Sequence, residues 1–222
     1  MIYPELQCIF VHIPKTGGTS VENALVEMDG TVTVHAHDHR SLWAIDPRRP
    51  ITSWLAPPSR TLPYLREAAR LTRSGKPGPR VSPEDYAHFL KVAFVRNPWS
   101  RAVSWYRNVL RDPRHRARHG VTPKTGFSEF LAQHAGRGML KPQTFWLTDR
   151  RGTPGVDVIG RFESLGEDFA GLAARFGRST ALPHLLHGRT EDFRRYYTDS
   201  DAALVGRVYA AEIKRFGYDF DG

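Results

Sequence analysis

The chain has 222 residues, 40% of them hydrophobic, which is enough to bury one substantial core, and we expect a single domain over residues 1–222. Its one cysteine, Cys8, excludes an internal disulfide and a zinc site built from cysteines. The formal net charge of +9 indicates an anionic partner, but charge alone does not distinguish a nucleic acid from a small polyanion.

The distribution of charge and hydropathy narrows the class of protein. No stretch approaches the roughly 18 apolar residues of a membrane span, and no basic leader with an apolar segment opens the chain. We therefore expect a cytoplasmic protein without a membrane span. The densest basic segment, residues 107–118, carries few aromatic residues and so lacks the stacking surface of many nucleic-acid-binding proteins. We interpret the basic residues of this segment as solvated charges on loops, some of which line an acceptor site. We expect no nucleic-acid partner.

The first predicted element is a buried strand at residues 8–13, which runs through a glycine turn into a helix. Thr19 and Glu22 have the spacing of a capping box at the start of that helix. Glycines let a backbone approach a ligand closely, and the amides and dipole of a helix start favour an anion. The candidate anion-binding residues of this loop are Lys15, Thr16, Gly17, Gly18, Thr19 and Ser20.

The position of the lysine argues against a nucleotide triphosphate site. In a Walker A loop the lysine follows the glycines, whereas Lys15 precedes Gly17 and Gly18 here. An ordinary strand-to-helix turn with an exposed lysine remains the alternative to anion binding.

The remaining elements alternate between strands and helices, which predicts an α/β fold with a mainly parallel sheet between two helical layers. Further strands are predicted at residues 31–36, 91–96 and 156–161. Helices are predicted after the cap at Ser82, over Ser100–Arg111, from a capping box at Ser164 and Glu167 to Phe176, and from Asp199 to Phe216.

Residues 46–82 are expected to be rich in loops, because half of the sixteen prolines lie between Pro47 and Pro83. Such a segment serves as a lid or an acceptor-binding element in many α/β domains, and a disordered linker is the alternative.

A second strand-to-helix loop, FVRNPWSRAVSWY at residues 94–106, accompanies the first, HIPKTGGTS at residues 12–20. Together they resemble the superfamily of sulfotransferases that use 3′-phosphoadenosine 5′-phosphosulfate (PAPS), in the branch of carbohydrate sulfotransferases and their bacterial relatives. The resemblance continues through residues 160–169 and 196–220. It implies a P-loop-like three-layer fold and transfer of a sulfuryl group from PAPS to an acceptor hydroxyl, without a metal.

The resemblance also implies roles for individual residues. The first loop binds the 5′-phosphosulfate, with Lys15 at the leaving group, and an arginine with a serine eight positions later binds the 3′-phosphate. Arg96 and Ser104 have that spacing. A structural salt bridge for Arg96 and a solvent-facing position for Ser104 are the alternatives. Arg189 lies where relatives often place a basic residue on the nucleotide.

Three histidines, at positions 35, 37 and 39, supply candidates for the base that activates the acceptor hydroxyl. In an extended chain all three lie on one face. The resemblance favours His39 first and His37 second. A polar surface and a metal site are the alternatives.

Three further residues are weaker candidates. Gln143 is a candidate for the acceptor site, and Trp54 or Trp99 for stacking on adenine, although packing in the core is the commoner role of aromatic residues. The competing functions are a small ATP-dependent kinase, a basic nucleic-acid-binding protein and a PAPS-binding protein without catalysis.

Overall fold

The computed structural model describes residues 1–32, 39–48, 58–75, 81–179, 182 and 192–221. Its sheet contains β1 (Ile2–Tyr3), β2 (Cys8–Val11), β3 (Leu90–Val95) and β4 (Val158–Arg161), hydrogen-bonded in that order. The pairs β2–β3 and β3–β4 are parallel, and the short edge strand β1 is antiparallel to β2. The predicted α/β fold with a mainly parallel sheet is confirmed.

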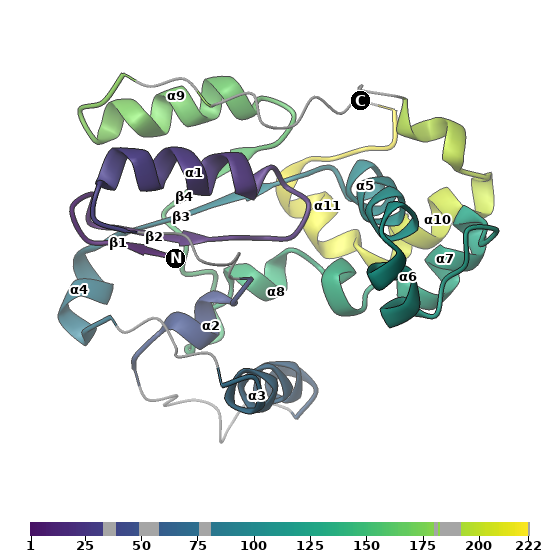
Figure 1. The fold of residues 1–222 in the computed structure, drawn as a ribbon, viewed down its shortest axis with the longest axis horizontal. Coiled ribbons are helices and arrows are strands. Elements are labelled where there is room, and N and C mark those ends of the chain that lie inside the picture. Colours follow the sequence, from purple (N-terminus) through teal and green to yellow (C-terminus); the bar gives the residue numbers. More distant parts are fainter. Residues whose placement is uncertain (33–38, 49–57, 76–80, 180–181, 183–191, 222) are drawn as a thin grey trace.

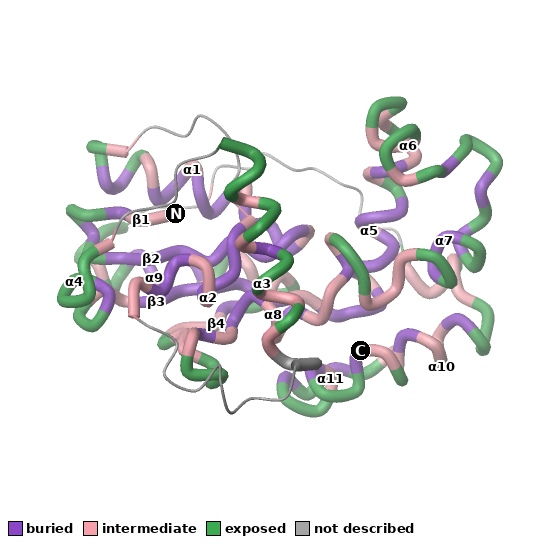
Figure 2. The backbone as a smooth tube through the Cα atoms, turned by 90° about the horizontal axis from the view of Figure 1, so that it is seen from below, coloured by how far each residue is buried: buried purple, intermediate pink, exposed green. Residues whose placement is uncertain are grey.

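Both faces of the sheet are buried, because successive side chains of a strand point to opposite sides. In β2, Phe10 packs with the core that includes Leu25 of α1 (Gly18–Asp29), whereas Ile9 belongs to the core on the other face, with Leu42 of α2 (Leu42–Ile45). Figure 2 shows β2 and β3 buried along their length. The strands therefore read as continuous apolar runs instead of alternating ones.

Helices cover the two faces and the carboxyl edge of the sheet (Figure 1). In that view α1 and α9 (Leu165–Arg175) lie above the sheet, and α2, α4 (Pro83–His88) and α8 (Thr144–Leu147) lie below it. Beyond the carboxyl ends of the strands lie α5 (Pro98–Arg111), α6 (Pro113–His119), α7 (Phe127–His134), α10 (Asp199–Val208) and α11 (Ala210–Phe216). The 3₁₀ turns η1 (Gly138–Leu140) and η2 (Phe193–Tyr196) complete the described elements.

The region predicted as rich in loops contains a helix of four turns, α3 (Pro58–Arg73), packed beside α2. Pro63 lies inside it, and a proline at that place argued against a helix in the sequence. The basic segment 107–118 is likewise helical instead of looped, because it spans the end of α5 and most of α6. Most of the strand predicted at residues 31–36 falls outside the described residues.

Two predicted capping boxes are wrong. Helix α1 begins two residues earlier than expected, after Gly17 with φ 82°, so Thr19 does not occupy the cap position. Ser164 precedes α9, but its hydroxyl donates to Asp168 (3.0 Å) and makes no cap hydrogen bond.

The helix predicted over 199–216 is two helices, α10 and α11, which are separated at Tyr209. The Tyr209 hydroxyl contacts the chain between α7 and α8. It accepts from the amide of Gly136 (2.9 Å) and donates to the carbonyl of Leu140 (2.5 Å). Helix α10 begins with a capping box that the sequence analysis did not identify, between Thr198 and Asp201. Among the described residues no helix is long and apolar enough to cross a membrane.

Candidate functional site

The segments that follow β2, β3 and β4 meet at the carboxyl edge of the sheet around a cavity of about 2290 Å³. Pockets for a single small ligand usually measure roughly 300–1,000 Å³, so this cavity has room for two ligands side by side. Edges of this kind are where ligands bind in parallel α/β sheets, because several loops and helix starts converge there.

The first loop presents backbone donors to this cavity. Gly17 takes a left-handed conformation with φ 82° and starts α1, which has no side-chain cap among the described residues. The amide of Ser20 already donates to the Gly17 carbonyl (3.1 Å), so the amides before it are the ones available to a ligand, and the helix dipole favours a negative ligand. Gly18 touches the ring of His12 so closely that a Cβ there would lie 2.1 Å from a ring carbon.

The side chains of this loop divide into two groups. Lys15, Gly17, Gly18 and Thr19, four of the six residues predicted to bind an anion, line the cavity. Thr16 is fully buried and its hydroxyl donates to the carbonyl of Ile13 (3.0 Å), while Ser20 is buried in α1. Neither belongs to the described lining of the cavity, and the Thr16 hydroxyl stabilises the loop from within through its bond to Ile13.

Lys15 lies in a basic part of the cavity. Its ammonium donates to Asn108 of α5 (3.3 Å). Burial, and after it the nearby charges of Arg96 and Arg111, together lower the pKa of Lys15 to about 8. An anion bound beside Lys15 would oppose this shift, because its negative charge favours the protonated ammonium.

The second loop places Arg96 directly after β3. Its guanidinium donates to the Ser100 hydroxyl (2.9 Å) and to the carbonyl of Lys15 (3.3 Å), and it lies over the ring of Phe162 at 3.8 Å. Burial lowers the pKa of Arg96 to about 10, while Glu163 opposes that shift. The structure therefore joins the two predicted loops through a direct hydrogen bond.

The backbone of Arg96 is fixed by Gln143, the residue predicted for the acceptor site. The Gln143 side chain accepts from the Arg96 amide and donates to the Arg96 carbonyl, both at 2.8 Å. It is fully buried and also donates to Glu212 (3.0 Å). The acceptor-site prediction is wrong, because this side chain has no face toward the cavity.

Helix α5 carries the other predicted anchor, Ser104, which lines the cavity one turn before Asn108. Residues three or four apart lie on the same helical face, so Ser104, Asn108 and Arg111 form one row along the wall. Asn108 in turn contacts His115 of α6, with 2.9 Å between Nδ2 and Nδ1.

His39, the first choice for the base, also lines the cavity. Its Nδ1 lies 3.2 Å from the carbonyl of His12, and its own carbonyl accepts from Trp146 Nε1 (3.3 Å). A carbonyl only accepts, so this hydrogen bond requires a proton on Nδ1. His35, His37 and Arg189 lie outside the described residues.

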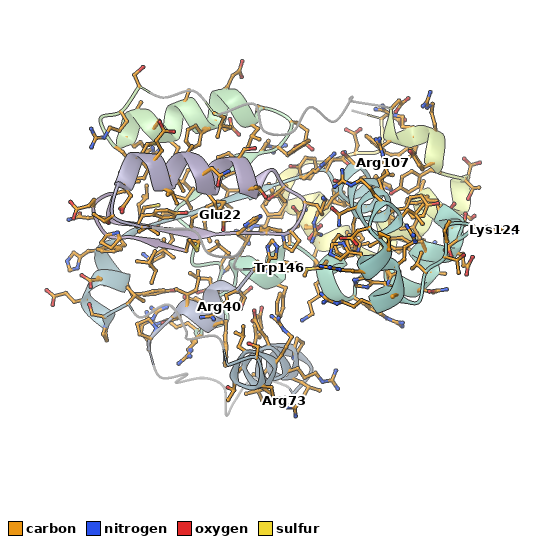
Figure 3. The ribbon with its side chains drawn as sticks, in the orientation of Figure 1. Glu22, Arg40, Arg73, Arg107, Lys124 and Trp146 are labelled. Atoms are coloured by element: carbon orange, nitrogen blue, oxygen red, sulfur yellow. The ribbon has the colours of Figure 1, made fainter. Side chains whose placement is uncertain are left out.

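His39, which is partly exposed, packs against the buried histidine His12. His12 stacks edge-on against the His39 ring, with 4.3 Å between the centroids, and its Nδ1 lies 2.9 Å from Glu22. Figure 3 shows Glu22 on the side of α1 that faces the sheet and Trp146 near the centre of the molecule. His12 therefore supports both the glycine loop and His39.

The tryptophan predictions have different outcomes. Trp99 is buried with 6% of its surface exposed, and its indole donates to the carbonyl of Ala202 (3.0 Å), so it is a core residue and is not among the described residues that line the cavity. Trp54 lies outside the described residues. Within the described part of the chain, no three His, Cys, Asp or Glu side chains are grouped so that they could hold a metal.

Sequence reasoning missed four residues of the site, each of which carried a usable signal. His12 is a polar residue at the end of an apolar strand, immediately before the loop. Asn108 follows Ser104 by one helical turn. Phe162 and Glu163 directly follow β4, at the same sheet edge as the two recognised loops.

Comparison with protein families gives one match that covers almost the whole chain. A family model described as the sulfotransferase family matches residues 1–219. Comparisons with curated proteins and with solved structures gave no match.

Proposed function

Because this chain belongs to the sulfotransferase family, we propose that it transfers the sulfuryl group of PAPS to the hydroxyl of a saccharide or another small hydroxylated acceptor. The observation that carries the proposal is the contact between the two loops, in which Arg96 donates to the carbonyl of Lys15 (3.3 Å) beside one cavity. One nucleotide with anionic groups at both ends matches two adjacent anion-binding loops.

The residues of the cavity fit such a donor. The uncapped start of α1 and Lys15 suit the 5′ end, and Arg96 with Ser104 suits the 3′-phosphate. Gly18 has no side chain, and the ring of His12 leaves no room for one. An anion can therefore approach the backbone amides of the loop closely.

Lys15 serves the leaving group in this proposal. As the bond between sulfur and the 5′-phosphate oxygen breaks, negative charge gathers on that oxygen, and a preorganised ammonium stabilises it. A pKa near 8 keeps the ammonium largely protonated at neutral pH and lets it donate its proton more readily than an ordinary lysine.

His39 serves the acceptor. Its Nε2 takes the proton from the attacking hydroxyl, while the carbonyl of His12 holds the ring through Nδ1. The acceptor oxygen then forms the bond to sulfur on the side opposite the leaving oxygen. His37 is the second candidate for this base.

The histidine assignment is tested by substitution. His39→Ala should lower turnover by about a hundredfold or more and leave nucleotide affinity nearly unchanged, because the base acts on the acceptor. A dead His37→Ala beside an active His39→Ala would move the role to His37. A bound metal lost in either variant would favour a metal site.

The function itself is tested by calorimetry and by transfer from labelled PAPS across a panel of hydroxylated acceptors. Wild type should bind 3′-phosphoadenosine 5′-phosphate (PAP) far more tightly than adenosine 5′-phosphate, and a labelled sulfated product should form. Equal binding of the two nucleotides, or a preference for ATP with magnesium, would replace the sulfotransferase proposal with the kinase alternative.

A further inference from the structure

We propose that Arg101 is a positioning residue, which fixes the backbone of Lys15 from the helix that carries the second loop. This inference rests on the proposed function, because it concerns the lysine assigned to the leaving group. Arg101 lies in the first turns of α5, between Arg96 and Ser104, and does not line the described cavity.

The guanidinium of Arg101 holds three backbone carbonyls. Its Nε donates to Pro14 (3.0 Å), one Nη to Lys141 (3.0 Å) and the other to Met139 (2.6 Å). Only 1% of the surface of Arg101 is exposed, so these three hydrogen bonds lie inside the protein. Breaking any of these hydrogen bonds would leave part of a buried charge without a partner, which costs free energy. The three segments are therefore held in one arrangement.

The carbonyl of Pro14 is a sensitive place for such a bond, because it belongs to the peptide that leads into Lys15. Lys15 has φ 70°, a left-handed conformation that a residue with a Cβ adopts rarely and at a cost. Arg101 holds the peptide on one side of Lys15, and Arg96 holds the carbonyl on the other (3.3 Å). Two arginines of the second loop thus impose the direction of the lysine in the first.

Arginine suits this task better than lysine does. Its planar fork carries five N–H donors in fixed directions, which is what three carbonyls from three segments require. The Trp146 ring lies 5.3 Å from the guanidinium carbon and keeps water from the carbonyls. Burial lowers the pKa of Arg101, and the charge of Glu212 opposes that shift.

A double-mutant cycle on PAP affinity tests the inference. Arg101→Lys and Lys15→Ala should each weaken PAP binding by about tenfold, the scale of one charge-assisted hydrogen bond. If Arg101 acts through Lys15, the double variant should lose little more than the single Lys15→Ala variant. A purely structural role predicts independent losses, which multiply to about a hundredfold and would overturn the proposal.

The control is Arg194→Lys. Arg194 also donates to backbone carbonyls, of Phe220 (3.0 Å) and Asp221, but it contacts neither loop. Its substitution should leave PAP affinity unchanged in both backgrounds. Wild-type protein that shows no preference for PAP over adenosine 5′-phosphate would remove the proposed function together with this inference, whereas additive losses in a PAP-binding protein remove the inference alone.

A second measurement on wild-type protein covers the case in which Arg101→Lys does not fold. The Nε proton of Arg101 should exchange slowly with solvent in nuclear magnetic resonance spectra, since it is buried and bonded to Pro14. Protection that persists when PAP is added supports the positioning role. Rapid exchange, in the presence or absence of PAP, contradicts it.

Discussion

The helices that follow the two loops differ at their first turn, because the first helix has no described side-chain cap and the second helix has one. Helix α1 starts from the left-handed Gly17 with no described side-chain cap, and its first residues, Gly18 and Thr19, line the cavity. Helix α5 starts from Asn97, whose side chain accepts from the amides of Trp99 (3.0 Å) and Ser100 (3.3 Å). The first loop offers backbone to an anion, whereas the second offers the side chain of Arg96.

This difference assigns separate tasks to the two loops. Backbone amides and a lysine surround a compact group from several sides, which suits the end of the nucleotide where a bond breaks. A guanidinium grips a phosphate in a fixed plane, which suits an anchor. Substitutions in the first loop should therefore change turnover most, and substitutions in the second should change affinity.

The largest effect is expected from Lys15→Ala. The ammonium acts on charge that develops during transfer, so its loss should cost about 3 kcal/mol of transition-state stabilisation, more than a hundredfold in turnover. The fold should survive, because the side chain lines the cavity and is not part of the core. Turnover with labelled PAPS and the unfolding transition measure the two quantities, and near-normal turnover would remove Lys15 from the reacting group.

The same lysine gives PAP binding a pH dependence. Bound phosphate raises the pKa of Lys15 above its value of about 8, so the complex holds more protons than the separate partners in that range. The affinity of wild type should therefore fall as pH rises above about 8. Calorimetry between about pH 7 and pH 9.5 should show this fall in wild type and lose it in Lys15→Ala. An identical pH profile in the two proteins would contradict the shift.

Next comes Arg96→Ala, which tests the anchor. A partly buried guanidinium–phosphate contact is worth about 1.5–3 kcal/mol, so the variant should lose ten- to a hundredfold of its affinity for PAP. Binding of adenosine 5′-phosphate, which lacks the 3′ group, should fall by much less, because the only contact that it loses is the support that Arg96 gives to the Lys15 carbonyl. Calorimetry of both nucleotides gives the comparison, and equal losses for the two would mean that Arg96 supports the loop and does not hold the 3′-phosphate.

Some residues of the site could be predicted from the sequence, and others could not. The spacing of Arg96 and Ser104 and the glycine loop at Lys15 are local patterns, and the structure brings all of them to one cavity. Gln143 and Arg101 act on loops far from them in sequence, through hydrogen bonds to backbone carbonyls. Every residue type has a backbone carbonyl, so the sequence does not indicate which carbonyl a side chain will bind. The roles of Gln143 and Arg101 therefore become visible only in the folded chain.

The glycine loop itself is tested by Gly18→Ala. The added Cβ would lie 2.1 Å from His12, whose ring is held by Glu22 (2.9 Å) and cannot move away cheaply. Overpacking of this kind costs about 1–3 kcal/mol, measurable as the free energy of unfolding in urea.

Gly166→Ala is the matched control in α9. Nothing lies within 4 Å of a Cβ at that position, so the variant should be as stable as wild type or slightly more stable. Equal stability of Gly18→Ala and wild type would show that His12 does not pack on the loop as closely as described.

The smallest effect is expected from Asn97→Ala, and it separates the two loops most directly. Loss of the cap of α5 should lower the free energy of unfolding by about 1 kcal/mol, and Asn97→Ser, which keeps an accepting oxygen, should recover most of it. Affinity for PAP should stay near that of wild type, because the amides that lose their cap do not bind the nucleotide and Gln143 still fixes Arg96. Urea unfolding and calorimetry measure the two. A fall in PAP affinity as large as that of Arg96→Ala would mean that the second loop binds phosphate through its amides, as the first does, and the contrast between the loops would be lost.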